Sequence, residues 1–185
     1  MIFQIKGTYS LSMSIHCNFL EVSMSTRCQI AFIDEYEEAW VYRHCDGYPS
    51  GVIGDLANLY NALSNSKAWG NRFQASYLAA NFIFYCKMTH YFHDKGLAEK
   101  KGGIFKEIFE YAHYFLGYGV CNKNDWHGDI EYFYKITPSK NNSWYIKIYT
   151  PYMDFWDKPD FTKLKLYWKG TLKQAIKKFL KGDKK

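Results

Sequence analysis

Two short polar segments hold the residues of this sequence that are best suited to chemistry. The first, "HCDGYPSG" at 44–51, places His44 at the end of an apolar run and Asp46 two residues later. The second, "DWHGDIEYFY" at 125–134, places His127 and Asp129 directly before another apolar run. Imidazoles and carboxylates move protons near neutral pH and also bind divalent metals. These four residues are therefore the candidate catalytic residues.

Each segment also has a purely structural interpretation, which stays open beside the functional one. Asp46-Gly47 and Tyr48-Pro49 are common turn dipeptides, and Gly51 allows backbone angles that other residues avoid. Gly128 and Asp129 in the second segment can equally form an ordinary loop. Both segments are then corners that connect strands and helices.

Further residues of these segments could surround a ligand. A helix expected after Pro49 would present free amides and its positive dipole end, which favour an anion such as phosphate. Aromatic rings nearby could stack on a base. The candidate ligand-binding residues are Arg43, Gly47, Tyr48, Gly51, Trp126, Glu131 and Tyr132.

The two segments meet if their flanking strands are neighbours. We expect a strand at 39–43 to lie antiparallel beside a strand at 130–136, so that the end of the first meets the start of the second. The two histidines and two carboxylates would then converge at one sheet edge. Their spacing does not indicate a metal site, but a divalent ion or acid–base chemistry would fit such a cluster. His90 and His93 are a weaker pair, because the acidic residue of a metalloprotease helix is missing between them.

The periodicity of apolar residues predicts an α+β fold. Alternation indicates strands at 28–33, 39–43, 130–136, 144–149 and 163–168. The spacing of apolar residues predicts helices at 52–63, 73–93 and 104–116. A polar loop at 95–103 separates the last two. Thr171 is a plausible N-cap for a final helix. We therefore expect an antiparallel-dominated sheet of about five strands, with roughly four helices packed mainly on one face.

Charge is concentrated at the end of the chain. The formal net charge is +6, yet residues 163–185 hold nine lysines and one aspartate, so the remainder is slightly acidic. In the final helix, Lys173, Lys177 and Lys181 form a stripe that would attract an acidic protein or nucleic acid. A solvated helix face is the alternative. Because residues 1–162 are slightly acidic, we rank nucleic acid behind the other partners. A DNA mimic is also disfavoured, because it would need a strongly negative surface.

Cysteine spacing and hydropathy bear on the environment of the protein. The five cysteines are odd in number and widely spaced, which favours reduced thiols in a cytoplasm over a disulfide framework. No apolar run is long enough to span a membrane, and the first residues lack the features of a signal peptide. We expect a peripheral leader or upstream-start extension at 1–23 and a single domain at 24–185.

Three segments carry a resemblance to known proteins. "STRCQIAF", "YRHCDGYPSG" and "HGDIEYFY" resemble a family of small uncharacterised proteins of phages and other mobile elements, over about 25–149. The first turn of that family reads histidine, an aromatic residue, then Asp-Gly-Tyr-Pro, so Cys45 departs from it. The resemblance implies a phage origin, translation from Met24 and, by association, a role in host takeover or defence evasion.

Two functions follow from these expectations. The first is binding, with hydrolysis as a further step, of a small phosphorylated or nucleotide-like ligand at the His/Asp site. The alternative is a non-enzymatic interaction protein that inhibits a host defence factor. The sequence does not identify the ligand, a cofactor, the host protein or the oligomeric state.

Overall fold

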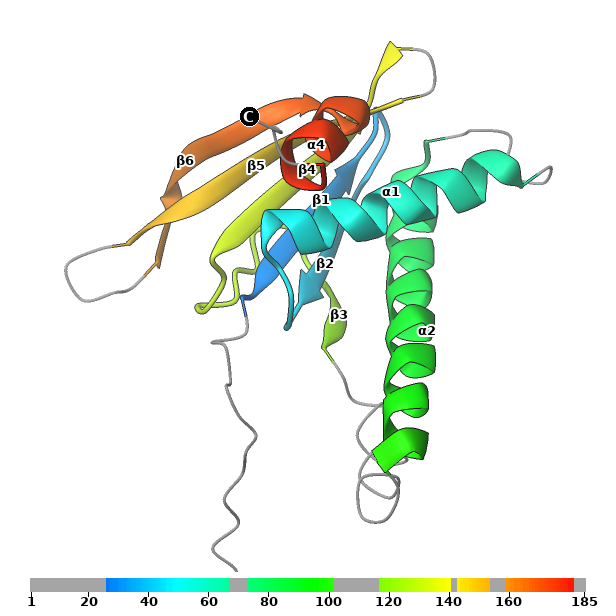
Figure 1. Ribbon diagram of the computed structural model, residues 1–185. Coiled ribbons are helices and arrows are strands. Elements are labelled where there is room, and N and C mark those ends of the chain that lie inside the picture. Colours follow the sequence, from blue (N-terminus) through cyan, green and yellow to red (C-terminus); the bar gives the residue numbers. More distant parts are fainter. Residues whose placement is uncertain (1–25, 67–72, 102–116, 141–142, 154–158, 182–185) are drawn as a thin grey trace, which may run out of the picture.

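The computed structural model describes residues 26–66, 73–101, 117–140, 143–153 and 159–181 (Figure 1). The predicted leader at 1–23 and the predicted helix at 104–116 lie outside these residues. The strands are β1 (Cys28–Ile33), β2 (Glu38–Arg43), β3 (Tyr118–Cys121), β4 (Tyr132–Pro138), β5 (Trp144–Met153) and β6 (Pro159–Thr171). The described helices are α1 (Pro49–Asn65), α2 (Ala75–Lys101) and α4 (Leu172–Phe179).

The strands form one mixed sheet in the order β3-β2-β1-β4-β5-β6. β1 and β4 run parallel, with Cys28 opposite Tyr132, and the other neighbouring strands run antiparallel. The predicted α+β class is confirmed. The details differ, because the sheet has six strands instead of about five, and the described part of the chain contains three helices instead of roughly four.

Two local predictions were wrong for identifiable reasons. β3 was missed because it is only four residues long and contains Gly119, which is unfavourable inside a strand. The polar loop expected from residue 95 is the last part of α2 as far as Lys101. Leu, Ala, Glu and Lys favour helices, and they outweigh the single Gly96 in that segment.

The expected pairing of strands 39–43 and 130–136 was also wrong. β1 lies between β2 and β4 and pairs with both. Its sequence "CQIAFI" is buried almost throughout, as expected for a central strand covered on both faces. The end of β2 and the start of β4 therefore still lie at the same end of the sheet, separated by β1.

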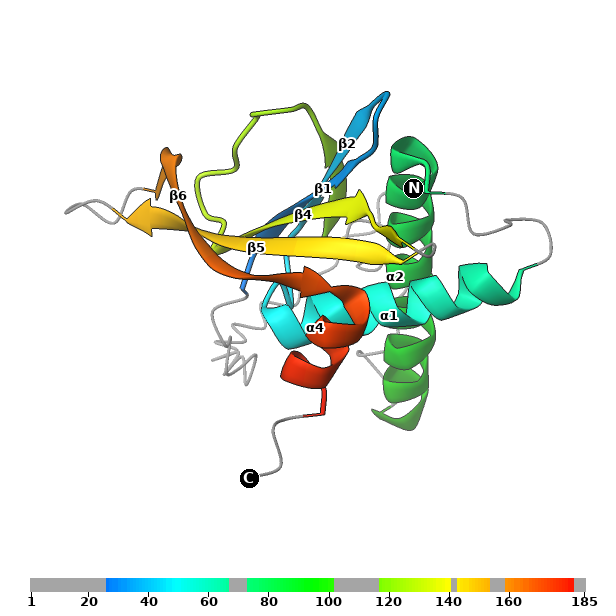
Figure 2. The same ribbon diagram turned by 90° about the horizontal axis from the view of Figure 1, so that it is seen from above.

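The helices cover one face of the sheet (Figures 1 and 2). Alternate residues of β1, β4 and β5, such as Ile30, Ile136 and Ile146, are fully buried against α1, α2 and α4 in the main core. Figure 2 shows the β3–β4 connection on the opposite side of the sheet. There Trp126 packs on a smaller cluster of Ala31, Trp40 and Phe133. We call this second side the open face.

Capping side chains explain where two of the helices begin. The acidic connector between β1 and β2 caps α2, because Asp34 Oδ2 accepts the Ala75 N–H at 2.8 Å and Glu37 Oε1 accepts the Ser76 N–H at 2.9 Å. Thr171 and Gln174 form a reciprocal capping box that starts α4, as the sequence predicted for Thr171. None of the described helices has the length and apolar character of a transmembrane span.

Candidate functional site

Arg27 brings the two polar segments together at the end of the sheet. It directly precedes β1, and its Nε donates to His44 Nδ1 at 3.2 Å. Its Nη1 forms an ion pair of 3.1 Å with Asp129 Oδ2. His44 follows β2, where its own N–H donates to Gly117 O at 2.7 Å and extends the ladder toward β3. One guanidinium therefore holds a histidine of the first segment and a carboxylate of the second.

Tyr42 connects the two histidines. Its ring stacks on the His127 ring with 3.9 Å between centroids and 17° between planes. Its hydroxyl lies 3.1 Å from His44 Nδ1. Three of the four candidate catalytic residues, His44, His127 and Asp129, therefore gather around Arg27 and Tyr42. We call these five residues the Arg27 cluster.

Gln29 positions the second segment. Its side chain is fully buried, and its amide is satisfied by hydrogen bonds. Nε2 donates to Asp125 O at 2.9 Å and contacts Cys121 Sγ at 3.2 Å. Its Oε1 accepts the His127 N–H at 3.3 Å. The backbone contributes as well, since Arg27 O accepts the Glu131 N–H at 2.9 Å. The segment that carries His127 and Asp129 is thus fixed against β1.

The electrostatics of the cluster determine where protons reside. Burial, together with the nearby Asp129 carboxylate, raises the pKa of Tyr42 to about 12. The phenol is therefore neutral at physiological pH. Because Arg27 Nε always carries its hydrogen, His44 Nδ1 accepts this hydrogen bond, and the ring hydrogen of His44 is then on Nε2. His127 is exposed to solvent.

Asp46 lies outside the Arg27 cluster, beside Tyr48. The Asp46 carboxylate is the main cause of a raised pKa of Tyr48. Asp46 has a positive φ of 54°, and Asp is one of the few residues besides glycine that tolerate this conformation. Tyr48 is 41% exposed at the start of α1. The fourth candidate catalytic residue therefore faces a different part of the turn.

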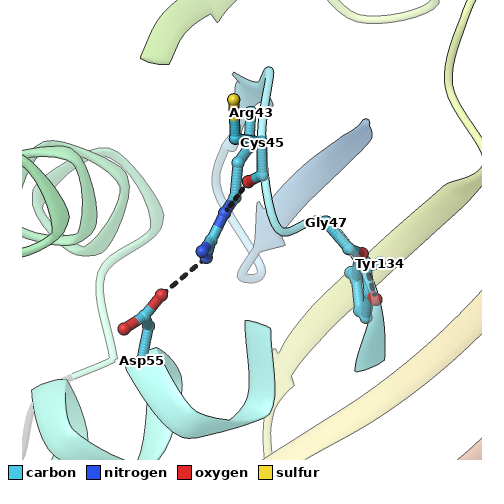
Figure 3. Close-up of polar contacts among 5 residues, drawn as sticks. All are labelled: Arg43, Cys45, Gly47, Asp55 and Tyr134. Carbon is cyan, nitrogen blue, oxygen red and sulfur yellow. Dashed lines mark hydrogen bonds and ion pairs between the residues drawn. The ribbon is translucent and has the colours of Figure 1, made fainter. Parts of the chain in front are cut away.

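The buried side chain of Arg43 links the first turn to α1 (Figure 3). It is only 1% exposed, its Nε donates to Cys45 O at 2.6 Å, and its Nη1 pairs with Asp55 Oδ2 at 2.6 Å. Burial disfavours its charge, but the neighbouring Tyr118 and Asp55 raise the pKa of Arg43 above its usual range. This guanidinium joins the turn to α1 and is inaccessible to a ligand at the surface.

Gly47 and Gly51 are required by close approach of the backbone. A Cβ at Gly47 would lie 2.8 Å from the backbone of Arg27, and one at Gly51 would lie 2.5 Å from Asp46 O. Gly47 also donates to Thr26 O at 2.7 Å and accepts a 2.7 Å hydrogen bond from the buried Tyr134 hydroxyl (Figure 3). These contacts support the structural interpretation for the part of the turn from Cys45 to Gly51.

The other candidate ligand-binding residues are spread over both faces. Trp126 packs edge-on against Trp40 on the open face, and Glu131 is exposed. Tyr132 packs with the main core on the helix face, near Tyr134 and Tyr167. Trp126 thus shares a face with His127, whereas Tyr132 does not.

The lysine stripe lies on the outside of the last helix. Lys173 and Lys177 are exposed on α4, where Leu172 and Ala175 are buried, and the exposed Lys181 follows the end of the helix at Phe179. Because α4 packs on the helix face, this stripe is remote from the open face.

The sequence did not identify Arg27 or Tyr42 as site residues. Their signals were weak: a charged residue directly before a buried strand, and a tyrosine at an outward position of β2. Among the described residues, no group of three or more His, Cys, Asp or Glu side chains could hold a metal ion. The ring of His90 lies 5.9 Å from that of Tyr118, and the side chain of His93 is outside the described part.

No family model, curated protein or solved structure shows significant similarity to the chain. The relationship to phage and mobile-element proteins therefore stays a prediction from the quoted segments.

Proposed function

We propose that the protein binds a small phosphorylated or nucleotide-like ligand at the Arg27 cluster and hydrolyses it there. The observation that carries this proposal is the position of Arg27 between His44 Nδ1 and Asp129 Oδ2, at 3.2 and 3.1 Å. The guanidinium is oriented by two neighbours, and its side chain is still 32% exposed. Its remaining N–H groups are suited to phosphate oxygens.

The histidines have different roles in this proposal. His44, with its proton on Nε2, is a second donor to the phosphate. His127 is exposed and takes a proton from water as the water oxygen bonds to phosphorus. The bond between phosphorus and the leaving oxygen breaks, and its electron pair leaves with that oxygen. A phosphate leaving group departs as an anion and needs no added proton, so a phosphoanhydride is the favoured substrate.

A thermal-shift screen tests this function. The ligands are nucleotides, cyclic nucleotides, ADP-ribose derivatives and divalent metals, with phosphate release as the second readout. We expect stabilisation of the wild type that disappears in His44→Ala/His127→Ala. The matched control is Asp46→Ala, which changes the same turn outside the cluster and should keep the shift. Equal shifts in the wild type and the double variant, or no shift with any ligand, would contradict the proposal.

Exposed apolar side chains on α2 support the alternative, an interaction protein that inhibits a host defence factor. Phe84, Met88 and Phe92 are 65%, 36% and 63% exposed, and their spacing of four residues places them along one face of the helix. Phe84→Asp/Phe92→Asp should then abolish the inhibitory phenotype in the host, while His44→Ala/His127→Ala retains it. The opposite pattern would favour the ligand site.

A further inference from the structure

Three lysines lie side by side across the open face. Lys135 on β4 is directly opposite Lys147 on β5, and Lys147 is directly opposite Lys169 on β6. Their sequence neighbours Ile136, Ile148 and Trp168 belong to the main core on the helix face, so the lysines alternate to the open face. Adjacent strands are about 4.8 Å apart, which brings three positive charges within roughly 10 Å. We call these residues the lysine row.

The lysine row is unfavourable for the protein alone. Like charges placed directly opposite each other destabilise a sheet. Among the described residues, no ion pair involves Lys135, Lys147 or Lys169. Glu38 interacts electrostatically with Lys135, but its carboxylate binds Lys123 Nζ at 2.9 Å and the Trp40 indole N–H at 3.1 Å. An anionic ligand on the row would reduce this repulsion.

A hollow lined by both apolar and polar groups adjoins the row. It has a volume of about 670 Å³. Beside Pro138 and the carbon chains of the lysines, the lining contains three amines and three hydroxyl groups, from Lys135, Lys140, Lys147, Thr137, Ser139 and Tyr145. Amines and hydroxyls are the groups that proteins use to contact phosphate and sugar oxygens.

Tyr145 is the aromatic ring of the hollow that a base could reach, because Phe133 on the other side of the row is fully buried. Tyr145, two residues before Lys147, is half-buried in the wall of the hollow. On the other side, Lys135 Nζ lies 5.6 Å from the Phe133 ring centroid and 5.8 Å from the Tyr149 ring centroid. Sheets that bind single-stranded nucleic acids combine such rings, on which bases stack, with cations along the backbone.

We propose that the open face of β4, β5 and β6 binds single-stranded nucleic acid, with phosphates on the lysine row and a base on Tyr145. A duplex is a poorer fit, because its bases are stacked inside and the broad face of a sheet cannot enter a groove to reach them. The proposal is independent of hydrolysis at the Arg27 cluster. It also differs from binding through the lysine stripe of α4, which lies on the helix face.

Fluorescence anisotropy with a labelled single-stranded oligonucleotide, using the full chain, tests this surface. For single strands, removal of one lysine–phosphate interaction reduces the dependence of log affinity on log salt by about 0.7. Lys135→Gln/Lys147→Gln/Lys169→Gln should therefore reduce this slope by about 2. The control, Lys173→Gln/Lys177→Gln/Lys178→Gln, removes the same charge from α4 and should leave the slope unchanged. Circular dichroism verifies that both variants are folded.

Tyr145→Leu distinguishes nucleic acid from other polyanions. Without a stacked base, single-strand binding should weaken roughly 5- to 150-fold, while heparin binding stays unchanged. The proposal is overturned if the wild type does not bind at low salt, or if both triple variants lose affinity equally. Tighter binding to a duplex of the same length, or a Tyr145→Leu variant with wild-type affinity, overturns it as well.

Discussion

The ring of His127 stacks on the ring of Tyr42, with 3.9 Å between their centroids. This contact joins the β3–β4 connection to β2, two strands away from the β4 that follows it. An aromatic pair of this kind contributes about 0.5–1.5 kcal/mol beyond the area that it buries. The stacking also fixes the orientation of the imidazole that we propose as the proton acceptor.

The first prediction concerns this stacking. His127→Ala should lower the free energy of unfolding by only about 1 kcal/mol, because the ring is exposed and the core is untouched. Amide exchange at 125–129 should increase while exchange in β1 stays slow. His127→Phe is the control, since it keeps the stacking without the imidazole. Equal exchange in the wild type and His127→Ala would show that the stacking does not hold the segment.

The second prediction concerns Gln29 of β1, which forms hydrogen bonds with the backbone of the same segment, 125–129. Gln29→Leu has a similar size but leaves Asp125 O and the His127 N–H without their partner. Removing the hydrogen-bond partner of a buried group costs about 1–3 kcal/mol, and because these two hydrogen bonds are partly buried we expect the lower end of that range. Urea denaturation should detect this destabilisation, together with faster amide exchange at 125–129. Unchanged stability would mean that water replaces the amide at no cost.

The third prediction compares three glycines of one segment. Gly47→Ala and Gly51→Ala should destabilise the fold, because each new methyl would meet backbone atoms at 2.8 and 2.5 Å. Gly54→Ala is the control within α1, where the nearest atom is the end of Leu180 at 4.0 Å. It should be neutral or stabilise by up to about 1 kcal/mol, because alanine favours helices. Thermal unfolding measures all three, and a stable Gly51→Ala would contradict the backbone argument.

Local periodicity predicted much of the fold correctly. β1, β2 and β5 begin within one residue of the expected positions, because apolar residues of the sheet recur at fixed spacing. Thr171 was recognised as an N-cap from its residue type. The position of β1 between β2 and β4 could not be predicted in this way, because strand order depends on long-range packing and leaves no local pattern.

The candidate site was predictable only in part, for a related reason. His44, His127 and Asp129 stood out because reactive residue types occur in turns. Arg27 and Tyr42, which join them, flank or occupy ordinary strands. Arg43 was predicted to bind a ligand, whereas its pairing with Asp55 on α1 buries it. The parallel pairing of β1 with β4 decides these contacts, and it is a property of the tertiary structure.

The fourth prediction concerns the pair Arg43–Asp55. Asp55→Ala leaves a buried guanidinium without its counter-ion, which costs about 3–5 kcal/mol. Arg43→Met/Asp55→Leu removes both charges from the buried site and should be less destabilised than the sum of the single variants. A double-mutant cycle by urea denaturation measures this coupling. Additive single effects would show that the pair is not a unit.

The fifth prediction concerns alkaline stability. Cys28 and Cys86 are buried thiols, and burial raises the pKa of each from 9.0 to about 12. Above pH 9 the unfolded chain loses these protons while the native protein keeps them. The free energy of unfolding should therefore be insensitive to these thiols below pH 9 and fall as the pH rises above it. Each thiol contributes at most about 1.4 kcal/mol per pH unit.

Urea denaturation between pH 9 and 10 isolates these thiols, because the ordinary tyrosine pKa is 10.0 and phenols contribute mainly at higher pH. Cys28→Ala/Cys86→Ala should flatten the dependence, although its overall stability is lower because the substitutions leave cavities in the core. A smaller slope should remain from Cys121, whose pKa is also raised, mainly by burial. Wild-type stability that stays constant across this interval would show that the two thiols ionise in the native protein as readily as in the unfolded chain.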